Sequence, residues 1–351
     1  MINSSQIKGA LFEYLIRRLL LSCRFNVVKP DGHYIFRNQG LFFINGKGAA
    51  HDADVLMDPP IQMPFSYPSR ILFECKAYSG PIGVNVLRGA LGLRWDINDF
   101  EIVTDDTIIR RKNNRRSQYA ISNRSRYLYN VGVASIFGFS KPAIEFAANN
   151  KIPLLSLKWF LPDSVCRKFQ SINDAYIVRN NTVDWNDIYI KLKDKSVDSD
   201  FRYIFDCDEV IRGIVSSFDN FVRNAYIALL ESGDMILLVN NEQNSFEDFV
   251  FDRGLIKAQI YYDTSNNKNW ELVIPDSGQV FNFYLPKRIM SLWGDYSFDS
   301  RIAINFKNDL FSRIFVFKKN TNTEGLPFVI INLDREWFDR IQAETDIIDQ
   351  W

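Results

Sequence analysis

The sequence predicts an α/β core in residues 1–160, followed by an α+β domain rich in strands in residues 161–351. The chain has 351 residues, 46% of them hydrophobic and 24% charged, so it is long enough for two domains of ordinary globular composition. Residues 1–160 contain 21 Lys and Arg against 12 Asp and Glu, a net charge of +9, and the remainder carries −9. This charge asymmetry suggests that residues 1–160 bind a polyanion and that the remainder does not.

The core begins with a predicted helix over residues 7–23, in which leucines and a final cysteine repeat every four residues on one face. Glu13 lies off this apolar stripe. A short strand is predicted over 25–28. Two further strands, over 41–44 and 51–57, are joined through Asn45-Gly46-Lys47-Gly48, because Asn-Gly is a strong hairpin signal.

An apolar strand over residues 71–76 follows a proline-rich loop and ends in Phe73-Glu74-Cys75-Lys76. The next segments favour a helix over 84–98, a strand over 128–137, a helix over 141–150 capped by Ser140, and a strand over 152–157. The order of helix, four strands, helix, strand, helix and strand is typical of an α/β core.

Beyond residue 160 short β-type runs and turns dominate, which indicates a strand-rich α+β domain. Its role could be specificity, regulation or oligomerisation. Two helices are predicted over 208–218 and 221–231. Strands are predicted over 235–239, 255–262, 270–274, 280–284, 302–306, 314–317 and 328–331.

Glu74 and Lys76 carry the clearest chemical signal, because residues two apart on a strand project from the same face. A carboxylate that holds a divalent cation, beside a lysine that orients water, suits phosphodiester hydrolysis. The alternative is an ordinary ion pair on an edge strand. Asp54, which would share a face with Asp52, is a second candidate carboxylate. It could instead cap amides at a strand end, and Asp52 competes with it as a ligand.

These residues also carry a family resemblance. The run from Gly46 to Val55 (GKGAAHDADV), followed by Phe73-Glu74-Cys75-Lys76, resembles the catalytic core of Mrr-like restriction endonucleases of the PD-(D/E)xK nuclease superfamily. The opening Lys8-Gly9-Ala10-Leu11-Phe12-Glu13 helix and the segment from Gly138 through Ala143 to Leu154 are similar to the family's flanking elements. The resemblance covers about residues 5–160 and implies a restriction-endonuclease-like core, a central mixed sheet flanked by helices.

The resemblance implies that Asp54, Glu74 and the backbone carbonyl of Cys75 bind Mg²⁺, for which Mn²⁺ could substitute. Lys76 would position the attacking water or stabilise charge on phosphorus. Glu13 is a further candidate, for a second cation or for a water of the first, unless it is a solvated helix residue. A common Mrr pattern has Gln at the position of Glu74, so this chain is nearer to the general superfamily motif.

A basic segment between residues 110 and 126 contains no acidic residue and fits contact with a phosphate backbone, or else forms a solvated loop. Its candidate nucleic-acid-binding residues are Arg110, Arg111, Lys112, Arg115, Arg116, Arg124 and Arg126. His51 could touch a phosphate, although a hydrogen-bonded hairpin histidine is favoured. Gly46-Lys47-Gly48 lacks the full spacing of a phosphate-binding loop and is interpreted as a turn.

The expected function is therefore a Mg²⁺-dependent endonuclease that hydrolyses DNA, in restriction of or defence against foreign DNA. Alternatives are a nucleic-acid-binding subunit of a defence complex that acts through a partner protein, and an RNA nuclease. A homodimer is expected if both strands of a duplex are cut. Four separated cysteines and two histidines argue against structural zinc, and no signal peptide or membrane segment is apparent, so a cytoplasmic location is expected.

Overall fold

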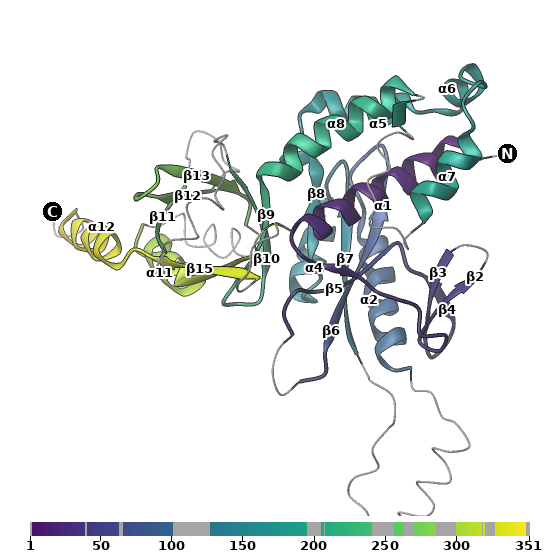
Figure 1. Cartoon of the computed structure of the whole chain (residues 1–351). Coiled ribbons are helices and arrows are strands. Elements are labelled where there is room, and N and C mark those ends of the chain that lie inside the picture. The colour runs from purple at the N-terminus through teal and green to yellow at the C-terminus, as the bar shows by residue number, and fades with distance from the viewer. Residues whose placement is uncertain are drawn as a thin grey trace, which may run out of the picture.

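The computed structural model describes residues 2–38, 41–62, 66–100, 127–194, 205–206, 208–240, 256–262, 270–285, 300–317, 319 and 327–348. Figure 1 shows an α/β part, a group of helices packed on its first helix, and a β-barrel to one side. The coarse expectation of an α/β core with a strand-rich domain is thereby confirmed. In the described ranges, no helix has the length and apolar character needed to cross a bilayer.

A mixed sheet of order β1-β5-β6-β7-β8 forms the centre of the α/β part. The antiparallel pairs join β1 (Asn26–Val27), β5 (Val55–Asp58) and β6 (Ser69–Lys76), whereas β6, β7 (Leu128–Ser135) and β8 (Leu154–Ser156) run parallel. The central position of β6 is consistent with its apolar, largely buried sequence, since strands covered on both faces read as apolar runs.

Helices cover both faces of this sheet. Phe73 packs into the core around α1 (Ser4–Ser22), while Leu72 packs into a second core with α2 (Val84–Asn98) and α4 (Lys141–Asn149). Neighbouring strand residues therefore serve opposite faces, as the pleat requires. The predicted cap is confirmed, because the Ser140 hydroxyl accepts the Ala143 N–H at 3.4 Å.

A small three-stranded sheet, β2-β3-β4, lies beside the central sheet. It comprises β2 (Ile35–Asn38), β3 (Leu41–Asn45) and β4 (Ala50–Asp52). The single strand predicted over 51–57 is wrong, because the chain leaves β4 after Asp52 and enters β5 of the central sheet at Val55. Asp52 and Asp54 consequently do not share the face of one strand.

A group of helices packs on α1 and shares its core. The bounds are α5 (Asp163–Ser171), α6 (Asp174–Arg179), α7 (Trp185–Lys193) and α8 (Glu209–Asn224), and a 3-10 turn covers Leu157–Trp159. The first turn of α1 is also fixed by Asp174, whose Oδ1 accepts the Ser4 N–H at 3.0 Å. Helix α1 is thus sandwiched between the sheet and these later helices.

The strand-rich domain is a closed barrel of order β10-β13-β12-β11-β15-β14-β9 with its own apolar core. Its strands are β9 (Ala225–Leu230), β10 (Met235–Asn240), β11 (Ile256–Tyr262), β12 (Trp270–Ile274), β13 (Gln279–Phe283), β14 (Arg313–Phe317) and β15 (Phe328–Leu333). Helices α11 (Ser300–Phe311) and α12 (Arg335–Ile348) accompany them.

Two element predictions in this half are wrong. The predicted helix over 221–231 is the end of α8 followed by β9, whose apolar residues pair with β10 and β14. The predicted strand over 302–306 lies within α11, where Ile304 and Phe311 both enter the barrel core. Their spacing of seven residues is two helical turns, which the short alternating pattern concealed.

A substitution at Gly132 in β7 would test how tightly this strand packs against Phe73 and the backbone of Pro153. A Cβ on Gly132 would lie 2.7 Å from Phe73 Cε1 and 3.0 Å from the backbone oxygen of Pro153. We expect Gly132→Ala to lower the free energy of unfolding by about 1–3 kcal/mol, measured by urea denaturation. The control is Gly92→Ala in α2, where a Cβ meets nothing within 4 Å and helix propensity favours Ala by about 0.5–1 kcal/mol. Equal effects of the two substitutions would contradict this packing.

Candidate active site

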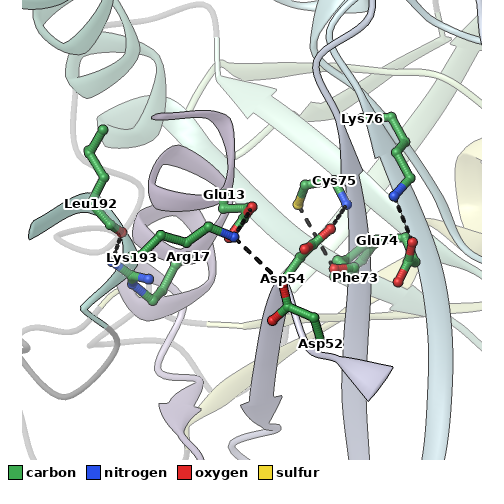
Figure 2. Close-up of polar contacts among 10 residues, drawn as sticks. All are labelled: Glu13, Arg17, Asp52, Asp54, Phe73, Glu74, Cys75, Lys76, Leu192 and Lys193. Carbon is green, nitrogen blue, oxygen red and sulfur yellow. Dashed lines mark hydrogen bonds and ion pairs between the residues drawn. The ribbon is translucent and has the colours of Figure 1, made fainter. Parts of the chain in front are cut away.

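The sheet brings Asp54 and Glu74 to the same edge. The register pairs Val55 with Phe73 in antiparallel β5 and β6, so Asp54, in the bend just before β5, lies next to Glu74 of β6. Lys76 ends β6 two residues further on. The three residues that the sequence singled out as catalytic are therefore neighbours at this edge, as Figure 2 shows.

Asp54 is half-buried between the two sheets, and its Oδ2 accepts the backbone N–H of Cys75 at 2.9 Å. This bond is the amide-capping role weighed as the alternative for Asp54. It uses one carboxylate oxygen and fixes the side chain beside β6. A capping role and a ligand role are compatible, because a carboxylate has two oxygens and about four lone-pair positions.

Glu74 and Lys76 form an ion pair, with 2.8 Å between Lys76 Nζ and Glu74 Oε2. The two side chains are only 20% and 25% exposed, and β6 is a central strand, so this is not a solvated edge-strand contact. Burial lowers the pKa of Lys76, but the pairing with Glu74 and the nearby charge of Asp54 outweigh it and raise that pKa. Lys76 is consequently held as a cation at the site.

A pocket of about 400 Å³ opens on this face of the sheet. Polar side chains of His51, Asp52 and Glu74 line one wall. Four residues of α2 also line the pocket: Val86, Gly89, Ala90 and Leu93. Glu74 thus faces a space that a ligand can enter.

His51, at the pocket wall, is fixed by a contact with α2. Its Nε2 lies 2.6 Å from Oδ2 of Asp96, whose Oδ1 accepts the Gly48 N–H at 2.7 Å. The expectation of a hydrogen-bonded hairpin histidine is confirmed. Residues 45–49 form the turn between β3 and β4, closed by a 2.7 Å bond from Gly46 N to Ala49 O, so the interpretation of Gly46-Lys47-Gly48 as a turn is confirmed too.

The Asp96 contacts predict a pH dependence. The bond to His51, followed by the bond from the Gly48 amide, lowers the pKa of Asp96 below its ordinary 3.8. A carboxyl with a lowered folded-state pKa stabilises the protein above pH 3.8, and this contribution is lost as the pH falls through the folded pKa. We expect the difference in melting temperature between wild type and Asp96→Asn to be full at neutral pH and to shrink in acid. Asp99→Asn is the control, since its exposed pairing with Lys47 at 3.4 Å contributes little. A difference that stays constant into acid would contradict the Asp96 anchor.

Glu13 is buried, at 4% exposure, so a solvated helix position is excluded. Its two oxygens accept from Lys193 Nζ at 2.7 and 2.8 Å. Lys193 ends α7, and it was missed by sequence reasoning because no helix was predicted over 185–193. The local signal was only a lysine pair, Lys191 and Lys193, which is ordinary for the last turn of a helix.

Lys193 also connects Glu13 to the hairpin. Its Nζ is 3.9 Å from Oδ2 of Asp52, and Figure 2 shows the ammonium between these two carboxylates. Burial lowers the pKa of Lys193, but the pairing with Glu13 and the charges of Asp54 and Asp52 raise it strongly. Asp52 is thus drawn toward Lys193.

The side chain of Cys75 does not belong to this charged group. Burial, with the neighbouring Asp54 charge, raises the pKa of its thiol well above the ordinary value, so the sulfur stays protonated. Any role of Cys75 toward a cation would fall to its backbone carbonyl, as expected from the sequence.

The donor set at Asp54 and Glu74 fits Mg²⁺. In each of these two carboxylates, one oxygen has a hydrogen-bond partner within the described ranges: Oδ2 of Asp54 and Oε2 of Glu74. The other oxygen of each carboxylate can bind a cation. No cluster of three His, Cys, Asp or Glu residues occurs in the part of the chain that the structure describes. Two carboxylates suffice for Mg²⁺, which keeps several of its waters.

The predicted nucleic-acid-binding residues, from Arg110 to Arg126, lie outside the described residues.

Comparison with known proteins adds little. No family model and no curated protein matches the chain. Among solved structures, the crystal structure of a protein of unknown function, AF1548, matches at 13% identity and a TM-score of 0.29, over 60% of this chain and 99% of that one. A TM-score this low supports no conclusion about fold or function.

Proposed function

We propose that this protein is a Mg²⁺-dependent endonuclease of the PD-(D/E)xK type, related to Mrr-like restriction enzymes, which hydrolyses DNA in defence against foreign DNA. The observation that supports this is the meeting of Asp54, Glu74 and Lys76 on adjoining strands of a mixed sheet, next to a pocket. The sheet with α1 on one face and α2 on the other also agrees with the core that the sequence resemblance implies.

Asp54 and Glu74, together with the carbonyl of Cys75, would hold the cation. When bound, Mg²⁺ supplies Lewis-acid polarisation of the phosphate and a more acidic water. Asp54 is pre-oriented by the Cys75 amide, so this carboxylate is already fixed before a substrate binds. Lys76 keeps a full positive charge beside Glu74 and stabilises the negative charge that builds up on the phosphate oxygens.

The net charge of +9 on residues 1–160 supports a polyanionic substrate. The acidic remainder suits another task, such as contact with a second copy or with a partner protein of a defence system. A cytoplasmic location agrees with access to DNA.

A digestion series tests the proposal. The purified protein is incubated with methylated, unmethylated and single-stranded DNA and with RNA, in Mg²⁺, Mn²⁺ or EDTA. We expect cleavage of DNA with either metal and none in EDTA. Cleavage of RNA but not of DNA would change the proposed substrate to RNA. If no polynucleotide is cleaved in a metal-dependent way, the proposed activity is wrong.

A further inference from the structure

The Lys193 ammonium contacts two carboxylates, Glu13 and Asp52, and the sequence resemblance made Glu13 a candidate ligand for a second cation. We propose that the site takes one divalent cation, at Asp54 and Glu74, and that the Lys193 ammonium holds Glu13 and Asp52 in place of another. This inference rests on the proposed function and assigns Lys193 as a positioning residue from outside the segment that resembles nucleases.

The backbone of Lys193 is fixed by packing. Trp185, Ile188 and Leu192 of α7 are buried in the core around α1. Arg17 of α1, itself 4% exposed, donates from Nη2 to the Leu192 carbonyl at 3.2 Å. This contact ties the last turn of α7 to α1, one residue before Lys193.

The side chain is then aimed at two acidic groups from different elements. Its Nζ bonds both oxygens of Glu13 on α1, and it reaches Asp52 at the end of β4. The Lys193 and Glu13 side chains are only 11% and 6% exposed, so their attraction is weakly screened. The other Asp52 oxygen, Oδ1, is buried without a hydrogen-bond partner in the described structure, which leaves Lys193 as the cation nearest to this carboxylate among the ion pairs described.

A divalent cation at Glu13 would have to lie against the Lys193 ammonium, which already contacts both Glu13 oxygens, or displace that ammonium from its ion pair. Losing one partner of a buried ion pair is strongly unfavourable. Asp54 and Glu74, by contrast, can each bind a cation without losing their present bonds. The two aspartates also differ in their contacts: Asp52 pairs with Lys193 at 3.9 Å, whereas Asp54 accepts the Cys75 amide on one oxygen and keeps the other for a cation.

The test counts the Mn²⁺ ions bound to the full-length protein without DNA, by calorimetric titration and by the electron paramagnetic resonance signal of free Mn²⁺. We expect one Mn²⁺ in the wild type and none after Asp54→Asn. Lys193→Met should admit a second Mn²⁺ at Glu13 and Asp52, and Lys193→Arg should keep the count at one. The double variant Glu13→Gln with Lys193→Met should return the count to one.

The outcomes separate this inference from the proposed function. Two Mn²⁺ in the wild type, reduced to one by Glu13→Gln, would overturn the inference and leave the nuclease proposal intact. No Mn²⁺ at Asp54 would overturn both. A folded Lys193→Met that still binds one Mn²⁺ would also overturn the role of Lys193. If Lys193→Met does not fold, Glu13→Gln decides, because in a one-cation site it leaves the count unchanged.

Discussion

Asp54→Asn and Lys76→Met are each expected to reduce the rate of DNA cleavage by roughly 10²- to 10³-fold or more, because the first removes a charge that holds the cation and the second a charge that stabilises the reacting phosphate. Asn keeps an oxygen that can accept the Cys75 amide, and Met keeps much of the length of the Lys76 side chain, so the fold is preserved. Single-turnover cleavage in Mg²⁺ gives the rate, and a gel shift in Ca²⁺ gives DNA binding, which we expect to persist.

The matched controls are Lys257→Met and Glu336→Gln, which remove an exposed ion pair of 3.3 Å between the barrel and α12. They remove a lysine and a carboxylate at a distance from the site and should cut at the wild-type rate. Wild-type cleavage by both Asp54→Asn and Lys76→Met would mean that the chemistry occurs elsewhere in the chain.

Lys193→Met is expected to lower the free energy of unfolding by about 3–5 kcal/mol, because it removes the ammonium that contacts both oxygens of the buried Glu13 carboxylate. The double variant Glu13→Gln with Lys193→Met removes both charges and should be much closer to wild type. Urea denaturation of the wild type, both single variants and the double variant forms a complete cycle.

The control for this double-mutant cycle is the ion pair of Lys191 and Asp187 on the same helix, with 2.6 Å between Lys191 Nζ and Asp187 Oδ2. Both of these side chains are partly exposed. A pair of this kind contributes about 0.3–0.5 kcal/mol, so its cycle should show weak coupling. If the Glu13 and Lys193 losses simply add in the double variant, the two side chains do not act as a unit.

Much of the candidate site follows from local sequence. The helix over residues 84–98 and the strand over 270–274 have the predicted bounds, because their periodicities are unambiguous. Asp54, Glu74 and Lys76 meet because strand alternation and one antiparallel register are enough to bring them together.

The parts that were missed depend on long-range packing. The break between β4 and β5 arises because the two halves of the segment predicted as one strand, over 51–57, pair in two different sheets. Lys193 is 180 residues from Glu13 in sequence, and no local pattern reports a contact at that distance. The apolar run of β9 reads equally as helix or strand until β10 and β14 pair with it.

The contact between Glu13 and Lys193 also orders events during synthesis. A ribosome makes the chain from its N-terminus, so α1 and the strand residues Asp54, Glu74 and Lys76 emerge long before α7. The charged group around Glu13 can therefore be completed only after residue 193 has been synthesised, well after the residues of α1, β5 and β6.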